Sequence, residues 1–232
     1  GGCHPLAALF DLEECFPFMQ RWAVRKIKIH VGFSEEWIRV GEALTREIRV
    51  YFFVEGLIFR GSDMISGMIQ GCSTSTVDMP LAMEIFINHT HQVILSAQLS
   101  ARFFQFADDL AMVTAVSRDG DHNRFAVVSI VLQEGKKGRH ILGLSFKIAK
   151  LQIITEQPYL SPEDRATLGS EVTSLLTKID TKGKYLGIWI SIYAAEQLEV
   201  LYSEVLPKVA ERVRHYAPQG RFQRRFIWRT YI

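Results

Sequence analysis

The sequence predicts an α+β fold in which helices cover an antiparallel sheet. Strand-like and helical patterns alternate along the 232 residues, short turns join several strand pairs, and 48% of the residues are hydrophobic. Short turns indicate hairpins, and hairpins join antiparallel strands, so a doubly wound parallel sheet is disfavoured. The charged fraction of 22% is ordinary for a globular protein, which excludes a disordered or collagen-like chain.

The first predicted elements are a strand and a helix. Residues 6–12 form a short apolar run with one acid, which indicates a buried strand with Asp11 near its end. Ser34 is a predicted N-cap, because the acids Glu35 and Glu36 follow it and suit the positive end of a helix dipole. Apolar residues then recur at spacings of three or four, so the core-facing side of this helix is expected to carry Trp37, Val40, Leu44 and Ile48.

A β-hairpin and a long helix are expected next. Residues 49–59 are rich in β-formers around a Glu55-Gly56 turn. A loop of small residues follows over 67–76, and the helix after it is expected to begin between 75 and 78, because Pro80 fits only in a first turn. The apolar face of this helix is predicted to hold Leu81, Ile85 and His89.

Two acids mark the tip of a second predicted hairpin. Residues 102–116 are strand-like on both sides of Ala107-Asp108-Asp109, which places the acid pair at the turn. A helix is expected over 121–142, with Asp121 as its N-cap and Gly143 as its terminator. Its apolar stripe is predicted to be Phe125, Val128 and Leu132.

The remaining sequence is expected to mix short elements. Strands are predicted at 145–148, 151–155 and 185–191, with a polar connection and a short helix over 156–184. A final helical pattern covers 196–216.

Charge and cysteine content restrict the function classes. The net charge of +2 is small, but residues 208–232 carry seven Lys or Arg side chains against one Glu, which indicates either a polyanion contact or a solvated basic helix. Three scattered cysteines give neither a disulfide framework nor a zinc site, which fits a reducing, intracellular compartment. No apolar run is long enough for a membrane span, and no signal peptide is recognisable.

The acids at strand ends are the main candidate for chemistry. An unpaired carboxylate is costly to bury, so Asp11, Asp108 and Asp109 are expected to need a cation. Carboxylates at adjoining strand ends supply the hard oxygen ligands that Mg²⁺ prefers, and two such ions about 4 Å apart can promote nucleotidyl transfer. The alternative is that the Asp-Asp pair is an ordinary solvated turn.

An ordered set of motifs resembles the reverse transcriptases of non-LTR (LINE-type) retrotransposons and their group II intron relatives. Residues 10–16 (FDLEECF) resemble motif A, and 69–72 (IQGC), after the Val54-Glu55-Gly56 hairpin, resemble motif B. Residues 106–109 (FADD) resemble motif C. The later signals are 142–150 (LGLSFKIAK) for motif D, 184–189 (KYLGIW) for motif E, and 220–222 (GRF) for the thumb.

The resemblance implies a metal site and a phosphate-directed lysine. Asp11 and Asp108 would coordinate two Mg²⁺ ions, or Mn²⁺, with Asp109 beside them and the carbonyl of Leu12 as a further ligand. Lys150 would act near the triphosphate and protonate the departing pyrophosphate. From the residue alone, Lys150 is equally an exposed lysine at a strand edge.

The resemblance also implies substrate contacts. Phe16 would be the steric gate that excludes a ribose 2′-OH, although packing in the core is the alternative that its residue type favours. The other residues expected to line the nucleotide and template side are Gln70, Gly71 and Ala107.

The C-terminal part would hold the primer and the duplex. Residues 1–192 would form the palm with the primer grip, and 193–232 the start of a helical thumb. The grip would consist of Tyr185, Leu186 and Gly187. Contacts to the nucleic-acid backbone would come from Lys208, Arg212, Arg221, Arg224 and Arg225.

Several positions depart from the family pattern. Glu14 stands in place of a lysine, Pro17 in place of an aspartate, Ile69 in place of an arginine, and Lys147 in place of an asparagine, while 73–76 replaces a P-L-S-P run. Ten residues precede Asp11, so the fingers of the family are expected to be missing from this sequence.

These features leave two readings and a blander third. The first is the palm and early thumb of an RNA-directed DNA polymerase with an RNA template, a DNA primer and dNTPs as partners, and the resemblance implies a nuclear location. The second is an inactive, polymerase-derived module that binds nucleic acid. The third is a decayed element copy. The sequence does not indicate an oligomeric state.

Overall fold

The computed structural model describes residues 3–13, 15–64, 66–69, 72, 74–106, 108–117, 122–200, 202–203, 206–208 and 210–211. The fold is α+β, as predicted, with a five-stranded sheet in the order β4-β5-β1-β6-β7. The strands are β1 (Cys3–Asp11), β4 (Ala101–Phe106), β5 (Asp109–Ser117), β6 (Gln152–Thr155) and β7 (Lys178–Asp180).

The sheet is mainly antiparallel. β1 runs antiparallel to both β5 and β6, and β4 to β5. β6 and β7 are parallel, because the chain between them crosses over through the helices α6 (Pro162–Leu168) and α7 (Ser170–Leu175). The expected polar connection with one short helix over 156–184 is therefore wrong in detail, since it holds two helices, β7 and the start of a further strand, Lys182–Tyr185.

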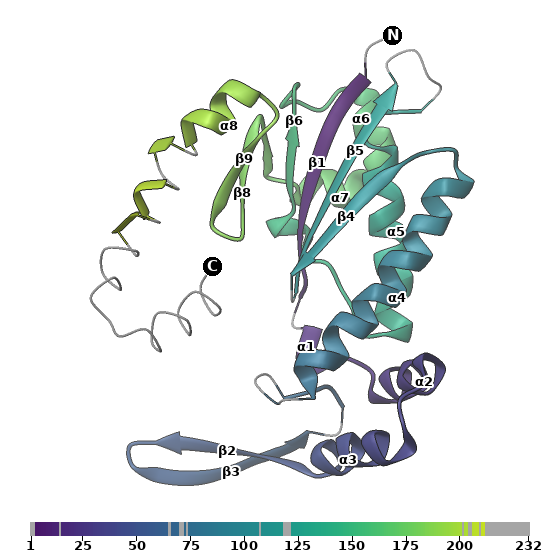
Figure 1. Cartoon of the computed structure of the whole chain (residues 1–232), viewed down its shortest axis with the longest axis vertical. Helices are drawn as coiled ribbons and strands as arrows, with labels where there is room; N and C mark the ends of the chain where they lie inside the picture. The colour runs from purple at the N-terminus through teal and green to yellow at the C-terminus, as the bar shows by residue number, and fades with distance from the viewer. Residues whose placement is uncertain are drawn as a thin grey trace.

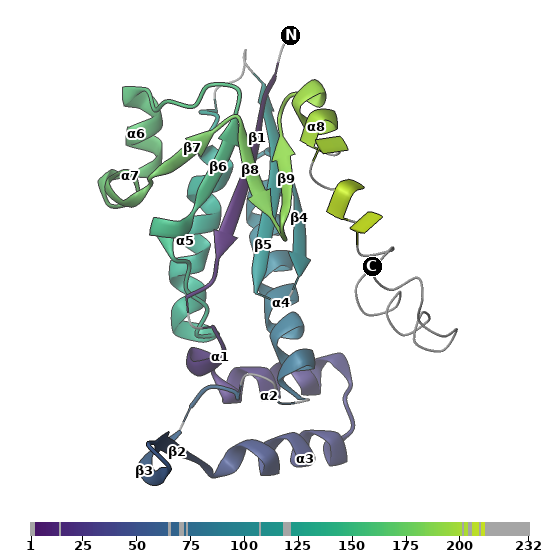
Figure 2. The ribbon, with the colours of Figure 1, turned by 90° about the vertical axis from the view of Figure 1, so that its left-hand side faces the viewer.

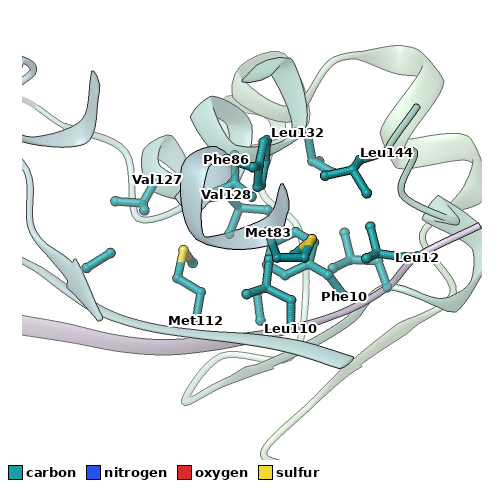
Figure 3. Close-up of a cluster of buried hydrophobic side chains, with 14 of the residues drawn as sticks. Phe10, Leu12, Met83, Phe86, Leu110, Met112, Val127, Val128, Leu132 and Leu144 are labelled. Atoms are coloured by element: carbon teal, nitrogen blue, oxygen red, sulfur yellow. The ribbon is translucent and has the colours of Figure 1, made fainter. Parts of the chain in front are cut away.

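The two longest helices cover one face of the sheet. α4 (Ser75–Ser96) and α5 (Ala126–Ile141) pack against each other and lie to the right of β1, β4 and β5 in Figure 1. Figure 3 shows the core between these layers, to which the strands and both helices contribute. Its fully buried members include Met83, Leu110, Met112, Phe125 and Val128.

The buried face of α4 is not the predicted one. Leu81 is half-buried, Ile85 is 39% exposed and His89 is exposed, and the helix instead turns another stripe towards the core. Pro80 is the sixth residue of α4 and so lies beyond the first turn, although the helix does begin at Ser75. The core-facing stripe is Met79, Ala82, Met83, Phe86, Thr90 and Ile94.

The start of α5 differs from prediction, and its end agrees. Phe125 occupies the N-cap position, its backbone N–H donates to Oδ1 of Asn123, and Asp121 lies outside the described residues. The helix ends at Ile141 before Gly143, which has φ +79°. A Cβ at Gly143 would lie 1.8 Å from the carbonyl oxygen of Phe18, so only glycine fits this close approach.

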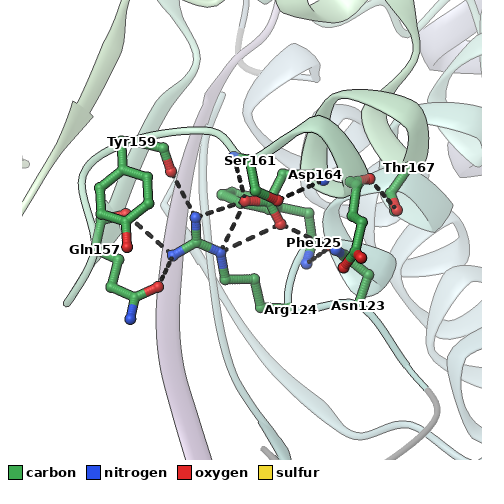
Figure 4. A network of polar contacts seen from close by, with 9 residues as sticks. Asn123, Arg124, Phe125, Gln157, Tyr159, Ser161, Asp164 and Thr167 are labelled. Atoms are coloured by element: carbon green, nitrogen blue, oxygen red, sulfur yellow. Dashed lines mark hydrogen bonds and ion pairs between the residues drawn. The ribbon is translucent and has the colours of Figure 1, made fainter.

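A buried ion pair joins α5 to α6 (Figure 4). Arg124 and Asp164 are 7% and 2% exposed, and Nη2 of Arg124 lies 2.6 Å from Oδ2 of Asp164. Arg124 also donates to the carbonyl oxygens of Gln157 and Tyr159. Asp164 closes a capping box with Ser161 at the start of α6, and these contacts hold the pKa of Asp164 at about 2 against the effect of burial.

Two further hairpins lie outside the five-stranded sheet. β2 (Ile48–Val54) and β3 (Leu57–Met64) form the predicted one, whose turn residues Glu55 and Gly56 both have positive φ, as a tight hairpin requires. The other consists of β8 (Lys182–Tyr185) and β9 (Ile188–Ser191), where a single strand was expected. Its turn, Leu186-Gly187, also has positive φ at both residues.

Three helices lie beyond one end of the sheet, below it in Figure 1. They are α1 (Cys15–Phe18), α2 (Arg21–Val31) and α3 (Glu35–Arg46), and the Ser34 hydroxyl caps α3 as predicted by accepting from the N–H of Trp37. The predicted apolar face of α3 is wrong, because Trp37 is 65% exposed and Val40 and Leu44 are 52% exposed. The buried side is Ile38, Gly41 and Thr45.

Small residues explain this reversal. A Cβ at Gly41 would lie 3.3 Å from Nζ of Lys28 on α2, so glycine allows the two helices to approach. Lys28 in turn forms a buried ion pair with Asp78 at the start of α4, at 2.6 Å. No helix in the described part of the chain is long and apolar enough to cross a membrane.

Candidate active site

The strand register brings two distant acids together. β1 and β5 pair along their whole length, from Cys3 opposite Ser117 to Asp11 opposite Asp109. These acids are 98 positions apart in the sequence and become neighbours because β1 ends, and the antiparallel β5 begins, at the same end of the sheet. Asp108 lies in the turn directly before β5, and the neighbouring Ala107 lies outside the described residues.

The pKa of Asp109 depends on the charged groups around it. Partial burial raises the pKa of Asp109 above its usual value, and the negative charges of Asp108 and Asp11 raise it further. The positive charge of Lys150 opposes this rise. Asp108, Asp11 and Lys150 therefore lie close enough to Asp109 to change the pKa of its carboxyl group.

Lys150 contacts the acid pair directly. Its Nζ lies 3.0 Å from Oδ2 of Asp11, and both side chains are partly exposed. The lysine ends a short 3₁₀ turn, Ile148–Lys150, where a strand over 145–148 was expected. That part of the prediction is wrong, because only Phe146 forms a bridge, opposite Leu12.

Backbone hydrogen bonds position this turn. The N–H of Lys147 donates to the carbonyl of Asp11 at 2.9 Å, and the N–H of Glu13 donates to the carbonyl of Ser145 at 2.7 Å. These two hydrogen bonds lie on either side of Leu12 and Phe146 and so form the antiparallel bridge between those two residues. Lys150 reaches Asp11 because these hydrogen bonds hold residues 11–13, at the end of β1, beside residues 145–147, which lead to the lysine.

The residues at this edge fit a divalent cation by the chemistry of their donors. Three carboxylates supply hard oxygen atoms, and the only positive group that the structure shows among them is one ammonium. Within the described residues no three His, Cys, Asp or Glu side chains already stand in a metal-binding cluster. The fit therefore rests on the opposed Asp11 and Asp109, with Asp108 next to Asp109 in the chain.

Phe16 lies in α1, directly after the acid-bearing strand. Its ring is half-buried and packs against the main core, so the structure shows the packing role and leaves the steric gate a prediction. Its carbonyl accepts from the N–H of Met68 at 2.6 Å. A Cβ at Gly67 would lie 1.9 Å from the carbonyl oxygen of Pro17, so α1 and residues 66–69 are in close contact.

Sequence reasoning missed Arg21, which holds the same loop. Its Nε donates to the carbonyl of Gly67 at 2.6 Å and its Nη2 to that of Met64 at 3.0 Å. No sequence signal marks this role, because both acceptors are backbone atoms more than 40 positions away. The segment leading to Gln70 and Gly71 is thus held beside α1, whereas those two residues lie outside the described residues.

Tyr185, at the end of β8, also reaches the acid-bearing hairpin. Its hydroxyl lies 3.2 Å from the carbonyl oxygen of Phe104 and 3.4 Å from that of Asp109. Burial and the charge of Asp109 raise the pKa of Tyr185, so the phenol stays protonated at neutral pH and can donate. Leu186 and Gly187 form the turn that follows, with Leu186 46% exposed.

The predicted nucleic-acid contacts at the C-terminus are mostly outside the described residues. This applies to Arg212, Arg221, Arg224 and Arg225, whereas Lys208 lies in a short helical piece over 206–208. α8 (Ala194–Val200) gives a helical beginning to the segment predicted as thumb. The proposed division at residue 192 stays a prediction.

Solved telomerase structures share this fold, although no family model and no curated protein matches the sequence. Apo telomerase from Candida tropicalis, truncated from the C-terminal domain, superposes with a TM-score of 0.54 at 14% identity, over 81% of this chain and 34% of that one. Apo telomerase from the same organism gives 0.56 at 13% identity, over 81% of this chain and 31% of that one.

A third structure is telomerase from Candida tropicalis in complex with the TWJ fragment of telomeric RNA. It superposes with a TM-score of 0.56 at 12% identity, over 82% of this chain and 29% of that one. The chain thus spans about a third of the length of these proteins. At such low identity the likeness establishes the fold alone, which is reverse-transcriptase-like.

Proposed function

We propose that the chain is the catalytic part of an RNA-directed DNA polymerase, which transfers a deoxynucleotidyl group from a dNTP to a primer 3′-OH on an RNA template. The observation that carries the proposal is the register of β1 and β5. It sets Asp11 opposite Asp109 at one end of these two strands, in a reverse-transcriptase-like sheet. Asp108 adds a third carboxylate beside them.

Magnesium would bind at this edge, held by Asp11, Asp108, Asp109 and the carbonyl of Leu12, with manganese as a substitute. When bound, two such ions lower the pKa of the attacking hydroxyl and stabilise charge on the leaving pyrophosphate. Lys150 already compensates the charge of Asp11, and from the same place it can donate a proton to the leaving group.

The motifs also propose contacts to the substrate. Phe16 follows the acid-bearing strand by one short turn, so its ring would limit the space at the sugar 2′ position. Gln70, Gly71 and Ala107 would line the base and template side, and the Tyr185–Gly187 turn would support the primer. The named complex of telomerase with telomeric RNA supports an RNA partner for a protein of this fold.

An origin in a non-LTR retrotransposon or a group II intron relative is part of the same proposal. It rests on the order of the motifs along the chain and implies a nuclear site of action. A second candidate, an inactive module that binds nucleic acid, is favoured by Ile69 and Pro17 in place of polar motif residues and by the basic C-terminal stretch.

Primer extension tests the proposal. The chain, incubated with an oligo(dT) primer on a poly(rA) template, dTTP and Mg²⁺, should extend the primer, and Asp108→Ala should reduce the rate by at least about 1000-fold, because a metal ligand is lost. The matched control is Asp63→Asn, an exposed acid on β3 that should extend normally. Circular dichroism should show both variants folded.

The alternative outcomes are distinct. Extension by Asp108→Ala at the unmodified rate would remove these acids from the mechanism. Salt-dependent binding of the primer–template without incorporation by the unmodified chain would replace the polymerase with the binding module. Neither extension nor binding would leave the decayed element copy.

A further inference from the structure

The β8–β9 hairpin rests on the sheet face that α4 and α5 leave uncovered. Figure 2 shows β8 and β9 in front of β1 and β5. A small apolar cluster fills the contact, and the hairpin therefore packs on the strands that carry the two opposed acids. The cluster consists of Ala7, Leu9, Ala111 and Ile154 from the sheet, with Tyr185, Ile190 and Ile192 packed against them.

Tyr185 adds a polar contact to this apolar one. Its hydroxyl is within reach of two carbonyl oxygens, that of Phe104 on β4 and that of Asp109 on β5. A hydroxyl has one proton and donates to one acceptor at a time. The acceptors lie on the two arms of the same hairpin, so either choice ties the acid-bearing tip to β8.

The contact acts on the backbone of an acid in the candidate site. Asp109 is the first residue of β5 and pairs with Phe106 across the turn and with Asp11 on the other side. A shift of its carbonyl away from Tyr185 would therefore carry its carboxylate away from Asp11. A misplacement of about 1 Å at a catalytic site can cost about 100-fold in rate.

Tyr185 directly precedes the turn between β8 and β9. Tyr185 pairs with Ile188, and only Leu186 and Gly187 stand between them, both with positive φ. A tight two-residue turn of this kind has one backbone shape. Whatever molecule touches the turn is thus held at a fixed offset from Asp109.

We propose that Tyr185 is a positioning residue that couples the β8–β9 turn to the β4–β5 tip, so that the primer end and the acid pair keep one relative position. The inference rests on the proposed function and deepens it, because it gives Tyr185 a role through Asp109 and Phe104 instead of through the primer. The ring packs on the sheet, and the hydroxyl sets the alignment.

Tyr185→Phe separates these two roles, because it keeps the ring and removes the hydroxyl. In steady-state extension kcat should fall about five- to tenfold, while KM for primer–template and for dNTP stays unchanged. The matched control is Tyr193→Phe, a nearby and 44% exposed tyrosine for which the described residues show no hydroxyl contact. That variant should behave as the unmodified chain.

Hydrogen exchange provides a readout that does not depend on activity. In Tyr185→Phe the amides of residues 105–110 should exchange several-fold faster, while those of 6–9 keep their protection because the ring packing is intact. Unchanged exchange and unchanged kcat would overturn the proposal. A rise in primer KM at constant kcat would also overturn it, because the hydroxyl would then act on the primer itself.

The experiments distinguish a failure of the proposed function from a failure of the coupling. If the unmodified chain does not extend a primer, the proposed function fails, and faster exchange at 105–110 in Tyr185→Phe would still support the coupling. If the chain extends normally and Tyr185→Phe changes neither kcat nor exchange, only the coupling fails.

Discussion

Asp164 and Asp109 show how position alone can give one residue type two opposite behaviours. Asp164 is almost fully buried, yet Arg124, Asn123 and the Ser161 backbone hold it charged. Asp109 is half-buried among other carboxylates, and Lys150 alone opposes the rise of its pKa. The first acid is satisfied by protein partners, whereas the second lies among like charges that raise its pKa.

The Asp164 network predicts a specific loss of stability in acid. The pKa of Asp164 is about 2 in the folded chain and about 3.9 when unfolded, so its stabilisation is fully present above about pH 4 and is lost as the pH falls towards 2. Thermal unfolding followed between pH 5 and 2 should show this fall in Tm. In Asp164→Asn the same interval should contribute a smaller fall, and an identical slope would contradict the assignment.

Removing Arg124 should destabilise the fold strongly. Arg124→Met leaves a buried carboxylate without its main partner, which typically costs about 3–5 kcal/mol in the free energy of unfolding. Arg165→Met, on the neighbouring helix α6, is the control and should cost little. Urea unfolding at pH 7 measures both.

At the scale of the element, the β2–β3 hairpin buries few of its own apolar side chains. Its strands expose large apolar side chains on both faces, and an isolated two-stranded hairpin is only marginally stable in water. Exposed apolar surface of this extent promotes association. The residues more than half exposed are Tyr51, Phe52, Phe53, Val54, Leu57, Ile58 and Phe59.

This surface should dominate dye binding and self-association. The double variant Phe53→Ser with Ile58→Thr should bind less anilinonaphthalene sulfonate and stay monodisperse at a higher concentration, with Tm nearly unchanged, because both side chains are more than 70% exposed. The control is Val31→Thr, an exposed apolar residue at the end of α2, away from the hairpin. Equal dye binding by both variants would contradict this reading.

The element scale also shows where sequence patterns succeed and fail. Turn chemistry predicted both acid-bearing and apolar hairpins, because Glu55-Gly56 and the 107–109 tip are local signals. Apolar spacing predicted that α3 exists but gave the wrong face, since the helix approaches its neighbour through Gly41 and Thr45 and leaves Trp37 outside. Periodicity reports which residues are apolar, and packing decides which of them are covered.

At the scale of the whole molecule, the candidate site depends on long-range register. The sequence identified Asp11 and Asp108–Asp109 as acids at the ends of apolar strands, and the pairing of β1 with β5 brings them together. The sequence could not reveal the contacts of Arg21 or Tyr185, because their acceptors are backbone carbonyls placed by the fold. The capping signal Ser161-Pro162-Glu163-Asp164 would have located α6.

Iron-directed cleavage tests most directly whether the two acid segments hold one cation. Fe²⁺ in place of Mg²⁺, with ascorbate and peroxide, produces radicals that cut the backbone beside the ion. We predict cuts near residue 11 and near 108–109 together, both suppressed by excess Mg²⁺ and both lost in Asp108→Ala. Cuts at one of these segments alone, or at both but unaffected by excess Mg²⁺, would contradict a shared metal site.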